Sequence, residues 1–516
     1  MPLTILTDSD VRNVCSTLTR DDLGVLQRCL ADALHSYSTA TDSHDSGCCA
    51  SNQPKRISIK RKDGATTLFM PATSDDAMGV KIVTIAESSC IKSSSNPRIF
   101  QTLPLTAEPT VSSASSRIWK TPNSSIASTK REDSIASSTN SIYESKSSSI
   151  SSTKEEDSNT SARTVPILDP RQPIDLTTSS DTSPKGSITL LSPTGQPRAL
   201  INASTLTAFR TALASSCLLR NRHSVHTITV FGAGLQAYWH LHIALLLRGK
   251  EIHHINVINR SFPRAQRLLM ALAQNENPAV DLHEKLRPSI LTPEYGEYQR
   301  LLKENVRDAD VIFCCTPSVT PLFPAGHLTN TEGRRKGRYI CAIGSYKPHM
   351  QELHEDIIRQ AVSAPHKEHH GAVHHRHASE GGAVVMDSID GAMLEAGEII
   401  NAGIGGQGLV ELGELVMLKR SHWANKSEKE ERERETREKE GKKESHRGRG
   451  LGHFFGHGKE RKEKEETEDD GGLQQWLQKG NVIYKSVGIG LMDVVVGMEI
   501  VRLAEERGIG TKVEDF

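Results

Sequence analysis

The chain of 516 residues balances 63 Lys and Arg against 63 Asp and Glu, and 36% of its residues are hydrophobic. Zero net charge argues against nucleic acid or an anionic membrane surface as a partner. Because no apolar run reaches transmembrane length and the first residues lack the pattern of a signal peptide, we expect a cytoplasmic protein. The nine cysteines form no CxxC pair, which is typical of a reducing compartment, and no metal site is assigned.

The first 87 residues predict a small α+β region. Apolar residues recur at helical spacing between residues 3 and 40, which predicts two amphipathic helices. Residues 57–70, ISIKRKDGATTLFM, alternate around a central Asp-Gly and predict a hairpin. Residues 79–85, GVKIVTI, predict a strand with Lys81 inside it. Such a lysine either faces solvent at an edge or points into a site.

Residues 88–183 are dominated by Ser and Thr and predict a disordered insert. Folded sequence resumes at Gly186 with a strand, a turn at 193–195 and a second strand. Ser204 is expected to cap a helix over residues 205–220. Arg210 lies on that helix and either pairs with a carboxylate on its face or serves a site.

Residues 226–237, HTITVFGAGLQA, predict a strand, a glycine turn and the start of a helix. This is the opening of a dinucleotide-binding βαβ unit. Gly232 would allow the tight turn, and Gly234 would let the backbone approach a pyrophosphate. The helix N-terminus would present N–H groups and a positive dipole end to that phosphate.

The next strand, residues 254–258, ends at Asn259, Arg260 and Ser261. An NAD site would place an acid there for the ribose 2′-hydroxyl. Arg260 and Ser261 instead stand where a 2′-phosphate would lie, which favours NADP over NAD; the alternative for Arg260 is an ordinary surface position. Later strands at 309–315 and 339–343 end at Thr316 and Gly344, which become site candidates because ligands bind at the carboxyl ends of parallel strands.

The last third of the chain alternates folded and low-complexity segments. Six histidines at 362–382 indicate either a metal site or a flexible surface insert, and we favour the insert. A strand at 383–387 and a helix at 391–400 follow. Residues 421–472 mix Lys, Arg and Glu, and predict an exposed insert rather than a nucleic-acid site. A strand at 482–488 and a helix at 491–507 close the chain.

The ordered segments resemble the ornithine cyclodeaminase/mu-crystallin family, and they occur in the family's order. The matching motifs are FMPA (69–72), GVKIVTI (79–85), STLTAFRTALAS (204–215), TVFGAGLQA (229–237), ADVIFCCTPS (309–318), AIGSYKPHMQEL (342–353), VVMDSIDGAMLEAGEI (384–399), ELGEL (411–415) and YKSVGIGLMD (484–493).

The resemblance implies an α/β protein with a Rossmann dinucleotide-binding domain and an α+β substrate/dimerisation domain built from both chain ends, with long disordered inserts between. We therefore assign residues 1–87 and 184–220, completed by 481–516, to the substrate domain. Residues 221–420 form the Rossmann domain. A homodimer is expected, as in most of the family.

The resemblance also implies site residues. Arg56 and Lys81 match the pair that holds the substrate carboxylate, and Arg210 matches an arginine at the nicotinamide and the substrate. Val487 matches a late substrate contact. The matches to cofactor contacts are Arg210, Thr211, Gly232, Gly234, Leu235, Gln236, Asn259, Arg260, Ser261, Thr316, Ala342, Ile343 and Ser486.

One position departs from the cyclodeaminases, which carry a catalytic Asp near Gly344. Tyr346 stands at that position here, and Met350 stands where the cyclodeaminases have a lysine. A tyrosine has a reference pKa near 10, so it is a poor base at neutral pH. Lys81 and Tyr346 are the remaining candidates for proton transfer, and the mu-crystallin-like branch also lacks the Asp.

Three functions remain open from the sequence. The leading hypothesis is an NADPH-dependent oxidoreductase that reduces a carboxylated imine or ketimine, with a small imino or amino acid as its partner. The alternatives are an ornithine cyclodeaminase or amino-acid dehydrogenase, and an NADPH-binding regulatory protein without catalytic activity. The sequence names neither the substrate nor the direction of the reaction.

Overall fold

The computed structural model describes residues 2–39, 48–85, 184–363, 382–415 and 473–516, all within one compact unit. The inserts expected at 88–183 and 421–472 lie outside the described residues, as does all but the ends of the one at 362–382. No helix in the described ranges has the length and apolar character to cross a membrane. Within the same ranges, no cluster of His, Cys, Asp or Glu is suited to hold a metal ion.

An eight-stranded parallel sheet forms the larger half of the fold, in the order β13-β12-β14-β11-β10-β7-β8-β9. Its strands are β7 (Thr227–Phe231), β8 (His254–Ile258), β9 (Arg287–Leu291), β10 (Val311–Cys314), β11 (Tyr339–Ala342), β12 (Val384–Met386), β13 (Leu409–Glu411) and β14 (Val482–Lys485). The central strands are buried along their whole length because helices cover both faces of such a sheet. The chain order reverses on the two sides of β7, which confirms the expected Rossmann arrangement.

The connections between these strands are mostly helical. They comprise α4 (Leu235–Arg248), α5 (Phe262–Ala273), α6 (Tyr298–Asp308), α7 (Gly326–Thr329), α8 (Glu355–Val362), α9 (Ile389–Glu395) and α10 (Gly397–Ala402), with short 3₁₀ turns η3 (Gly333–Arg335) and η4 (Gly406–Gly408). The single helix expected at 391–400 is divided into α9 and α10, because the backbone of Ala396 is extended between them.

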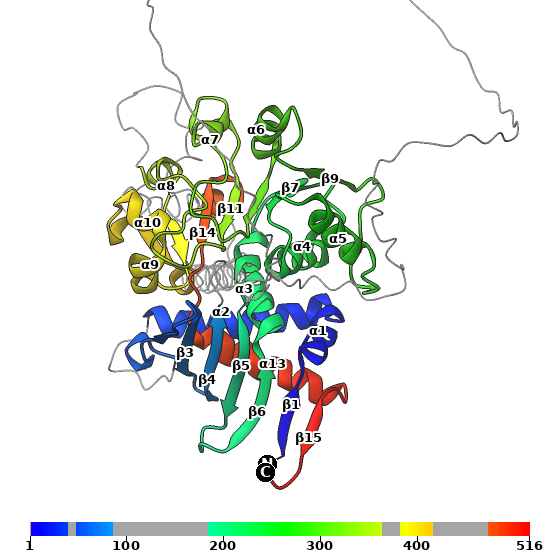
Figure 1. Cartoon of the computed structure of the whole chain (residues 1–516), viewed down its shortest axis with the longest axis vertical. Coiled ribbons are helices and arrows are strands. Elements are labelled where there is room, and N and C mark those ends of the chain that lie inside the picture. Colours follow the sequence, from blue (N-terminus) through cyan, green and yellow to red (C-terminus); the bar gives the residue numbers. More distant parts are fainter. Residues whose placement is uncertain (1, 40–47, 86–183, 364–381, 416–472) are drawn as a thin grey trace, which may run out of the picture. The chain divides into compact units, whose positions relative to one another are not determined.

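A seven-stranded sheet in the order β15-β1-β6-β5-β4-β3-β2 forms the other half. Its strands are β1 (Leu3–Leu6), β2 (Ile57–Lys60), β3 (Thr66–Thr73), β4 (Met78–Ile85), β5 (Lys185–Leu191), β6 (Pro197–Asn202) and β15 (Thr511–Val513). The helices that accompany it are α1 (Asp8–Ser16), α2 (Arg20–Thr39), α3 (Ala203–Leu219) and α13 (Gly490–Glu506), and the 3₁₀ turn η1 (Ala50–Asn52) follows α2. Strands from the two chain ends, β1 and β15, pair in antiparallel fashion, as Figure 1 shows.

Three local expectations differ from the structure. Helix α3 begins at Ala203 and is capped by Asn202, whose side chain accepts a hydrogen bond from the backbone N–H of Ser204, so Ser204 is not the cap. β14 pairs with β11 and β12 of the parallel sheet, although we had placed 481–516 wholly with the other half. β9 was missed because its residues, RPSIL, lack the apolar run of a buried strand.

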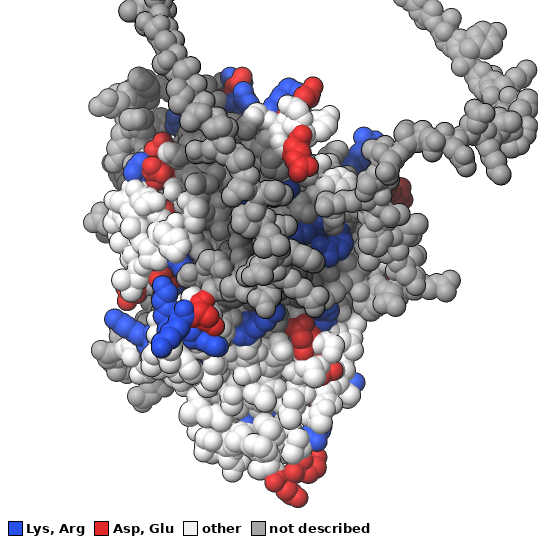
Figure 2. All heavy atoms as spheres, viewed as in Figure 1, with Lys and Arg blue, Asp and Glu red and all other residues white. Residues whose placement is uncertain are grey.

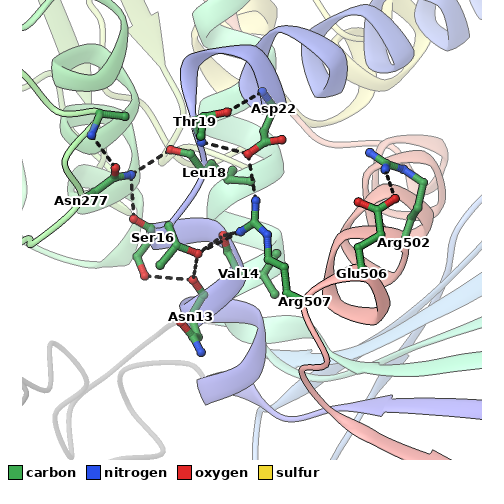
Figure 3. A network of polar contacts seen from close by, with 12 residues as sticks. Asn13, Val14, Ser16, Leu18, Thr19, Asp22, Asn277, Arg502, Glu506 and Arg507 are labelled. Atoms are coloured by element: carbon green, nitrogen blue, oxygen red, sulfur yellow. Dashed lines mark hydrogen bonds and ion pairs between the residues drawn. The ribbon is translucent and has the colours of Figure 1, made fainter.

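The two halves share one hydrophobic core and several polar contacts. The Phe209 ring on α3 lies 5.4 Å from the Trp239 ring on α4, in an edge-to-face arrangement. Figure 3 shows a polar network at the turn between α1 and α2. Asn277, which follows α5, donates from Nδ2 to the carbonyls of Ser16 (2.9 Å) and Leu18 (2.8 Å). These bonds satisfy the carbonyl of the last residue of α1 and one in the turn after it, neither of which the helix itself can satisfy.

Candidate active site

The glycine turn after β7 has the shape that a dinucleotide pyrophosphate needs. Gly232 has φ +102, and a Cβ there would lie 2.8 Å from the carbonyl oxygen of Cys315, so no other residue fits this turn. Gly234 is the N-cap of α4, and a Cβ there would meet no atom within 4 Å. The open space therefore lies in front of the α4 N-terminus, where backbone N–H groups point outward.

A second observation at this turn also fits a ligand. The side-chain Oε1 of Gln236, in the first turn of α4, is buried and has no hydrogen-bond partner among the described residues. Buried polar atoms without a partner are rare in native proteins and ask for an explanation. A dinucleotide in front of α4 would supply polar partners. The residues present therefore fit the group that the sequence motif implies.

The end of β8 carries no acid in the structure either. The Asn259 side chain donates from Nδ2 to the carbonyl of Ser261 at 2.8 Å, which orders this short loop. Arg260 is exposed and Ser261 is half-buried. The loop therefore presents a cation and a hydroxyl beside the glycine turn.

The remaining expected cofactor contacts occupy two different settings. Thr316, Ile343 and Ser486 follow β10, β11 and β14, which are neighbours in the sheet, so the fold places them at the same carboxyl edge. Leu235 is buried at the start of α4. Thr211 is buried in α3, and its hydroxyl donates to the Thr207 carbonyl at 2.8 Å.

Two of the expected substrate-binding cations share one buried acid. Lys81 on β4 places Nζ 2.9 Å from Oδ1 of Asp493, and Arg210 on α3 places Nε 3.2 Å from the same oxygen. All three side chains are buried. The second oxygen of Asp493, Oδ2, has no hydrogen-bond partner among the described residues. Within this group of three side chains, one carboxylate faces two cations, which favours an anionic ligand.

Burial brings the titration of Lys81 close to neutral pH. Its pKa is about 8, because burial and Arg210 lower it more than Asp493 raises it. An ammonium group with that pKa is able to give and take a proton near physiological pH. The structure thus gives Lys81 a buried position and a partner, rather than the solvent-facing position that was the alternative.

Arg56 lies just before β2 and approaches the same region. Its guanidinium forms an ion pair with Glu395 at the end of α9, and about a quarter of each side chain is exposed. Burial lowers the pKa of Arg56, Asp387 raises it and Arg210 lowers it, so these charges lie close enough to interact. Glu395 therefore brings a helix of the parallel-sheet half to the cations that are expected to bind the substrate.

Asp387, at the carboxyl end of β12, shapes the loop after β14. Its carboxylate accepts hydrogen bonds from the Ser486 hydroxyl (2.7 Å) and from the backbone N–H groups of Val487 (3.1 Å) and Gly488 (2.7 Å). A Cβ on Gly488 would lie 2.7 Å from a guanidinium nitrogen of Arg210, and its φ is +81. Asp387 thus holds Ser486 and Val487 in a loop that directly adjoins Arg210.

The sequence analysis missed the acids of this site. Asp387 and Asp493 lie within the motifs that carry the family resemblance, and Asp493 is the one acid in the first two turns of a helix that is otherwise apolar there. A lone acid inside an apolar helix is costly unless it has a cationic partner. That feature was the available indication, but nothing local identifies Lys81, which is 412 residues away in the chain, as the partner.

Tyr346 lies half-buried in the loop after β11, with Lys347 Nζ 5.9 Å from the centroid of its ring. Its neighbour Ser345 is fully buried. The loop follows a strand whose carboxyl end faces the dinucleotide turn, so the position suits a contact with either ligand. The role of Tyr346 in proton transfer stays a prediction.

No family model matches the chain. An uncharacterised protein of Saccharomyces cerevisiae is 29% identical over 261 residues, which cover 46% of this chain and 65% of that protein. An uncharacterised cyclodeaminase of Dictyostelium discoideum is 32% identical over 166 residues, covering 31% and 44%. A Delta(1)-pyrroline-2-carboxylate reductase of Bacillus cereus is 24% identical over 328 residues, covering 62% and 71%. The chain thus spans less than two thirds of the first two relatives.

The ketimine reductase mu-crystallin of Mus musculus is 24% identical over 238 residues, covering 45% of this chain and 59% of that protein. With cyclodeaminase, pyrroline-carboxylate reductase and mu-crystallin all among the relatives, the expected resemblance is confirmed. The chain is similar to the ornithine cyclodeaminase/mu-crystallin family.

Solved structures are similar to this chain at the level of the fold. The Delta(1)-pyrroline-2-carboxylate reductase of Thermococcus litoralis, in complex with NADH and L-proline, has a TM-score of 0.53 at 16% identity and covers 99% of this chain and 100% of its own. A lysine cyclodeaminase has a TM-score of 0.54 at 15% identity, covering 99% and 95%. The cyclodeaminase/mu-crystallin fold therefore accounts for both sheets of the described chain.

Proposed function

We propose that this chain is an NADPH-dependent reductase of a carboxylated imine or ketimine. The observation that carries the proposal is the buried group of Lys81, Arg210 and Asp493, with two cations on one acid. It lies in the same compact unit as a glycine turn suited to a dinucleotide. Relatives named as a Delta(1)-pyrroline-2-carboxylate reductase and a ketimine reductase support the same chemistry.

The chain's own residues would bind and orient the substrate. Arg56, Lys81 and Arg210 would hold its carboxylate, since guanidinium groups bind carboxylates through paired hydrogen bonds. The loop at Val487, fixed by Asp387, would contact the substrate beside Arg210. A substrate carboxylate that binds Arg56 would have to displace Glu395 from its ion pair with that guanidinium. Glu395 would therefore favour substrates whose carboxylate binds Arg56 strongly enough to do so.

Reduction of an imine needs one hydride and one proton. The nicotinamide, when bound, supplies the hydride to the imine carbon. The residues that would hold the dinucleotide are those of the glycine turn and the carboxyl edge, from Gly232 to Gln236 and at Thr316, Ala342, Ile343 and Ser486. Lys81 would hold the proton at Nζ near the imine nitrogen, because its pKa of about 8 keeps it largely protonated at neutral pH. Tyr346 is the second candidate for this proton.

The choice of NADP over NAD rests on the end of β8. Asn259, Arg260 and Ser261 provide no carboxylate for a ribose 2′-hydroxyl, and Arg260 is an exposed cation at that position. A 2′-phosphate would gain a charge-assisted hydrogen bond there. We therefore propose that NADPH binds more tightly than NADH.

A homodimer is supported by the edge of the seven-stranded sheet. β2 is the last strand of that sheet, and Ile57 and Ile59 on it are 60% and 52% exposed. Exposed apolar side chains on an edge strand are prone to pair with another chain. On the face shown in Figure 2, much of this half carries uncharged side chains, with Lys and Arg gathered at its left side and Asp and Glu at its lower tip. A cytoplasmic location stays a prediction from composition.

The second candidate is an ornithine cyclodeaminase, which the Dictyostelium relative's name favours. Tyr346 at the place of the cyclodeaminase Asp argues against it. Incubation of the purified chain with ornithine and NAD, followed by assay of ammonia and proline, separates the two functions. Ammonia release at a rate comparable with imine reduction would replace our proposal.

The direct test titrates NADPH and NADH into the purified full chain and then measures NADPH oxidation with Delta(1)-pyrroline-2-carboxylate and other carboxylated cyclic imines. We expect NADPH to bind more tightly than NADH and at least one imine to be reduced. Tight NADPH binding without turnover of any imine or amino acid would instead support a regulatory protein.

A further inference from the structure

A buried glutamate, Glu352, joins the ends of two strands that border the dinucleotide site. Its Oε1 accepts hydrogen bonds from the backbone N–H (2.7 Å) and the hydroxyl (3.1 Å) of Thr316, which follows β10. Its Oε2 accepts from the backbone N–H groups of Gly344 (2.6 Å) and Ser345 (3.3 Å), which follow β11. One carboxylate thus receives four donors from two loops, and its side chain is fully buried.

The two loops are in contact where Glu352 joins them. A Cβ added to Gly344 would lie 2.1 Å from the carbonyl oxygen of Thr316, so only glycine allows this approach. The backbone of the Glu352 segment adds two further bonds, from Gln351 N–H to Ser318 (2.8 Å) and from Leu322 N–H to the Glu352 carbonyl (2.9 Å). The shape of the carboxyl edge at β10 and β11 therefore depends on this one side chain.

A second layer of charge lies behind Glu352. Lys485, the last residue of β14, donates from Nζ to the Ser345 hydroxyl at 2.6 Å and lies 3.2 Å from Glu398 on α10. The Ser345 hydroxyl donates to Glu398 at 2.6 Å. One lysine faces two glutamates in a fully buried cluster, so an ionised Glu352 carries a negative charge without its own cation. Residue 486, a proposed cofactor contact, follows Lys485 directly.

We infer that Glu352 is a positioning residue, whose ionised carboxylate holds Thr316 and Gly344 in the shape that receives the dinucleotide, so that protonation of Glu352 weakens cofactor binding. The inference rests on the proposed dinucleotide site. All four donors to Glu352 require an acceptor, and a protonated carboxyl group loses part of that capacity. Glu352 does not touch the reacting atoms, and it acts through the two loops.

The titration of this group falls within the physiological range. The pKa of Glu352 is about 7, because burial and Glu398 raise it more than Lys485 lowers it. The other titratable groups that face it are Cys314 on β10 and Cys315, which follows that strand; burial raises their thiol pKa values well above the ordinary value, so both stay neutral. The ionised form dominates above about pH 7, and affinity should fall as the pH decreases through that value.

The experiment measures the dissociation constants of NADPH and NADH for the full chain from about pH 6 to about pH 9, in the wild type, Glu352→Gln and Glu398→Gln. The 2′-phosphate of NADPH itself titrates near pH 6, by analogy with phosphorylated side chains. NADH lacks that group, and each ligand is compared across variants, so the protein's contribution is separable.

We expect wild-type affinity to fall as the pH decreases through about 7. Glu352→Gln should bind about tenfold more weakly at high pH and lose this pH dependence, because its charged acceptor is gone. Glu398→Gln should keep the affinity at high pH and move the midpoint to lower pH, because a neighbouring negative charge has been removed. In the unliganded protein, amide exchange at Thr316 and Gly344 should become faster in Glu352→Gln.

The outcomes are distinguishable. If the wild type binds neither nucleotide at any pH, the proposed function fails. If the wild type binds and both variants match its affinity and pH profile, the inference about Glu352 is overturned and the proposed function stands. If Glu352→Gln does not fold, Glu398→Gln decides, since a lowered midpoint supports the inference and an unchanged midpoint overturns it.

Discussion

At the scale of single residues, the cations of the candidate site depend on buried carboxylates that compensate their charge. Asp493 is fully buried and serves both Lys81 and Arg210. Removing one partner of a buried ion pair costs far more than the pair contributes, because the other charge stays buried without compensation. The same side chains therefore control both the stability of the fold and the charge offered to a substrate.

We predict that Asp493→Asn lowers the free energy of unfolding by about 3–5 kcal/mol, because two buried cations lose their shared carboxylate. Denaturant unfolding of the variant and the wild type measures this change. Glu506→Gln is the matched control on the same helix: its partner Arg502 is exposed, and such pairs contribute about 1 kcal/mol or less. Equal losses in the two variants would contradict the role of Asp493.

A pH profile tests Lys81. If its ammonium group provides the proton for imine reduction, kcat/KM should decrease with increasing pH above about 8, because the group loses its proton there. Lys81→Arg keeps the charge and, since arginine does not titrate in this range, should remove that decrease at the cost of a lower rate. A decrease at the same pH in both proteins would assign it to another group, such as the imine itself.

At the scale of elements, substitutions at the two glycines of the turn after β7 should differ in their effect on stability. Gly232→Ala should destabilise the protein by about 1–3 kcal/mol, since φ is +102 and the new Cβ would meet the Cys315 carbonyl. Gly234→Ala should leave the unliganded protein about as stable as the wild type, because no atom lies within 4 Å of the new Cβ.

Both glycine variants should bind the dinucleotide more weakly, since the Gly234 position faces the space proposed for the pyrophosphate. Thermal unfolding without ligand and a nucleotide titration measure the two effects. A Gly234→Ala protein with wild-type affinity for NADPH and NADH would show that the pyrophosphate does not lie there.

Most elements of this fold could be predicted from the sequence because their apolar patterns are long. The strand at β8 agrees with the expected bounds to the residue. The N-cap of α3 could not be predicted from the sequence, because Asn202 and Ser204 both have capping side chains and their spacing does not distinguish between them. β9, β13 and β15 are short or polar edge strands, and only their pairing defines them.

The candidate site was predicted only in part, for a related reason. Lys81, Arg210 and Gly232 lie in motifs that are visible locally. Their partners Asp493 and Cys315 come from other elements, and no local pattern indicates which side chain meets which. Glu352 was noted in the sequence only as part of a motif, and its four hydrogen bonds appear only once two loops lie side by side.

At the scale of the whole molecule, the chain ends and the parallel-sheet half are joined by specific polar contacts. The turn between α1 and α2 receives Asn277 from one side and Arg507, after α13, from the other (Figure 3). Arg507 donates to Asp22 at 2.8 Å and to the Thr17 hydroxyl at 2.9 Å. The turn is thus a joint on which segments from three parts of the sequence converge.

We predict that Asn277→Ala destabilises the protein by about 1–3 kcal/mol, since two carbonyls at the end of α1 lose their donor in a buried place. The neighbouring exposed residue provides the control, and Glu276→Ala should change the stability by less than about 0.5 kcal/mol. Denaturant unfolding compares the two. A loss in Asn277→Ala no larger than in the control would show that the joint contributes little.

The most direct test of the proposed activity is a reduction of Delta(1)-pyrroline-2-carboxylate by the purified full chain with NADPH deuterated at the transferable position of the nicotinamide. The account predicts proline carrying one deuterium at its α-carbon, formed by the wild type and strongly reduced in Arg56→Ala, while NADPH still binds the variant. A wild type that binds NADPH but forms no deuterated product from this or any other carboxylated imine would contradict it.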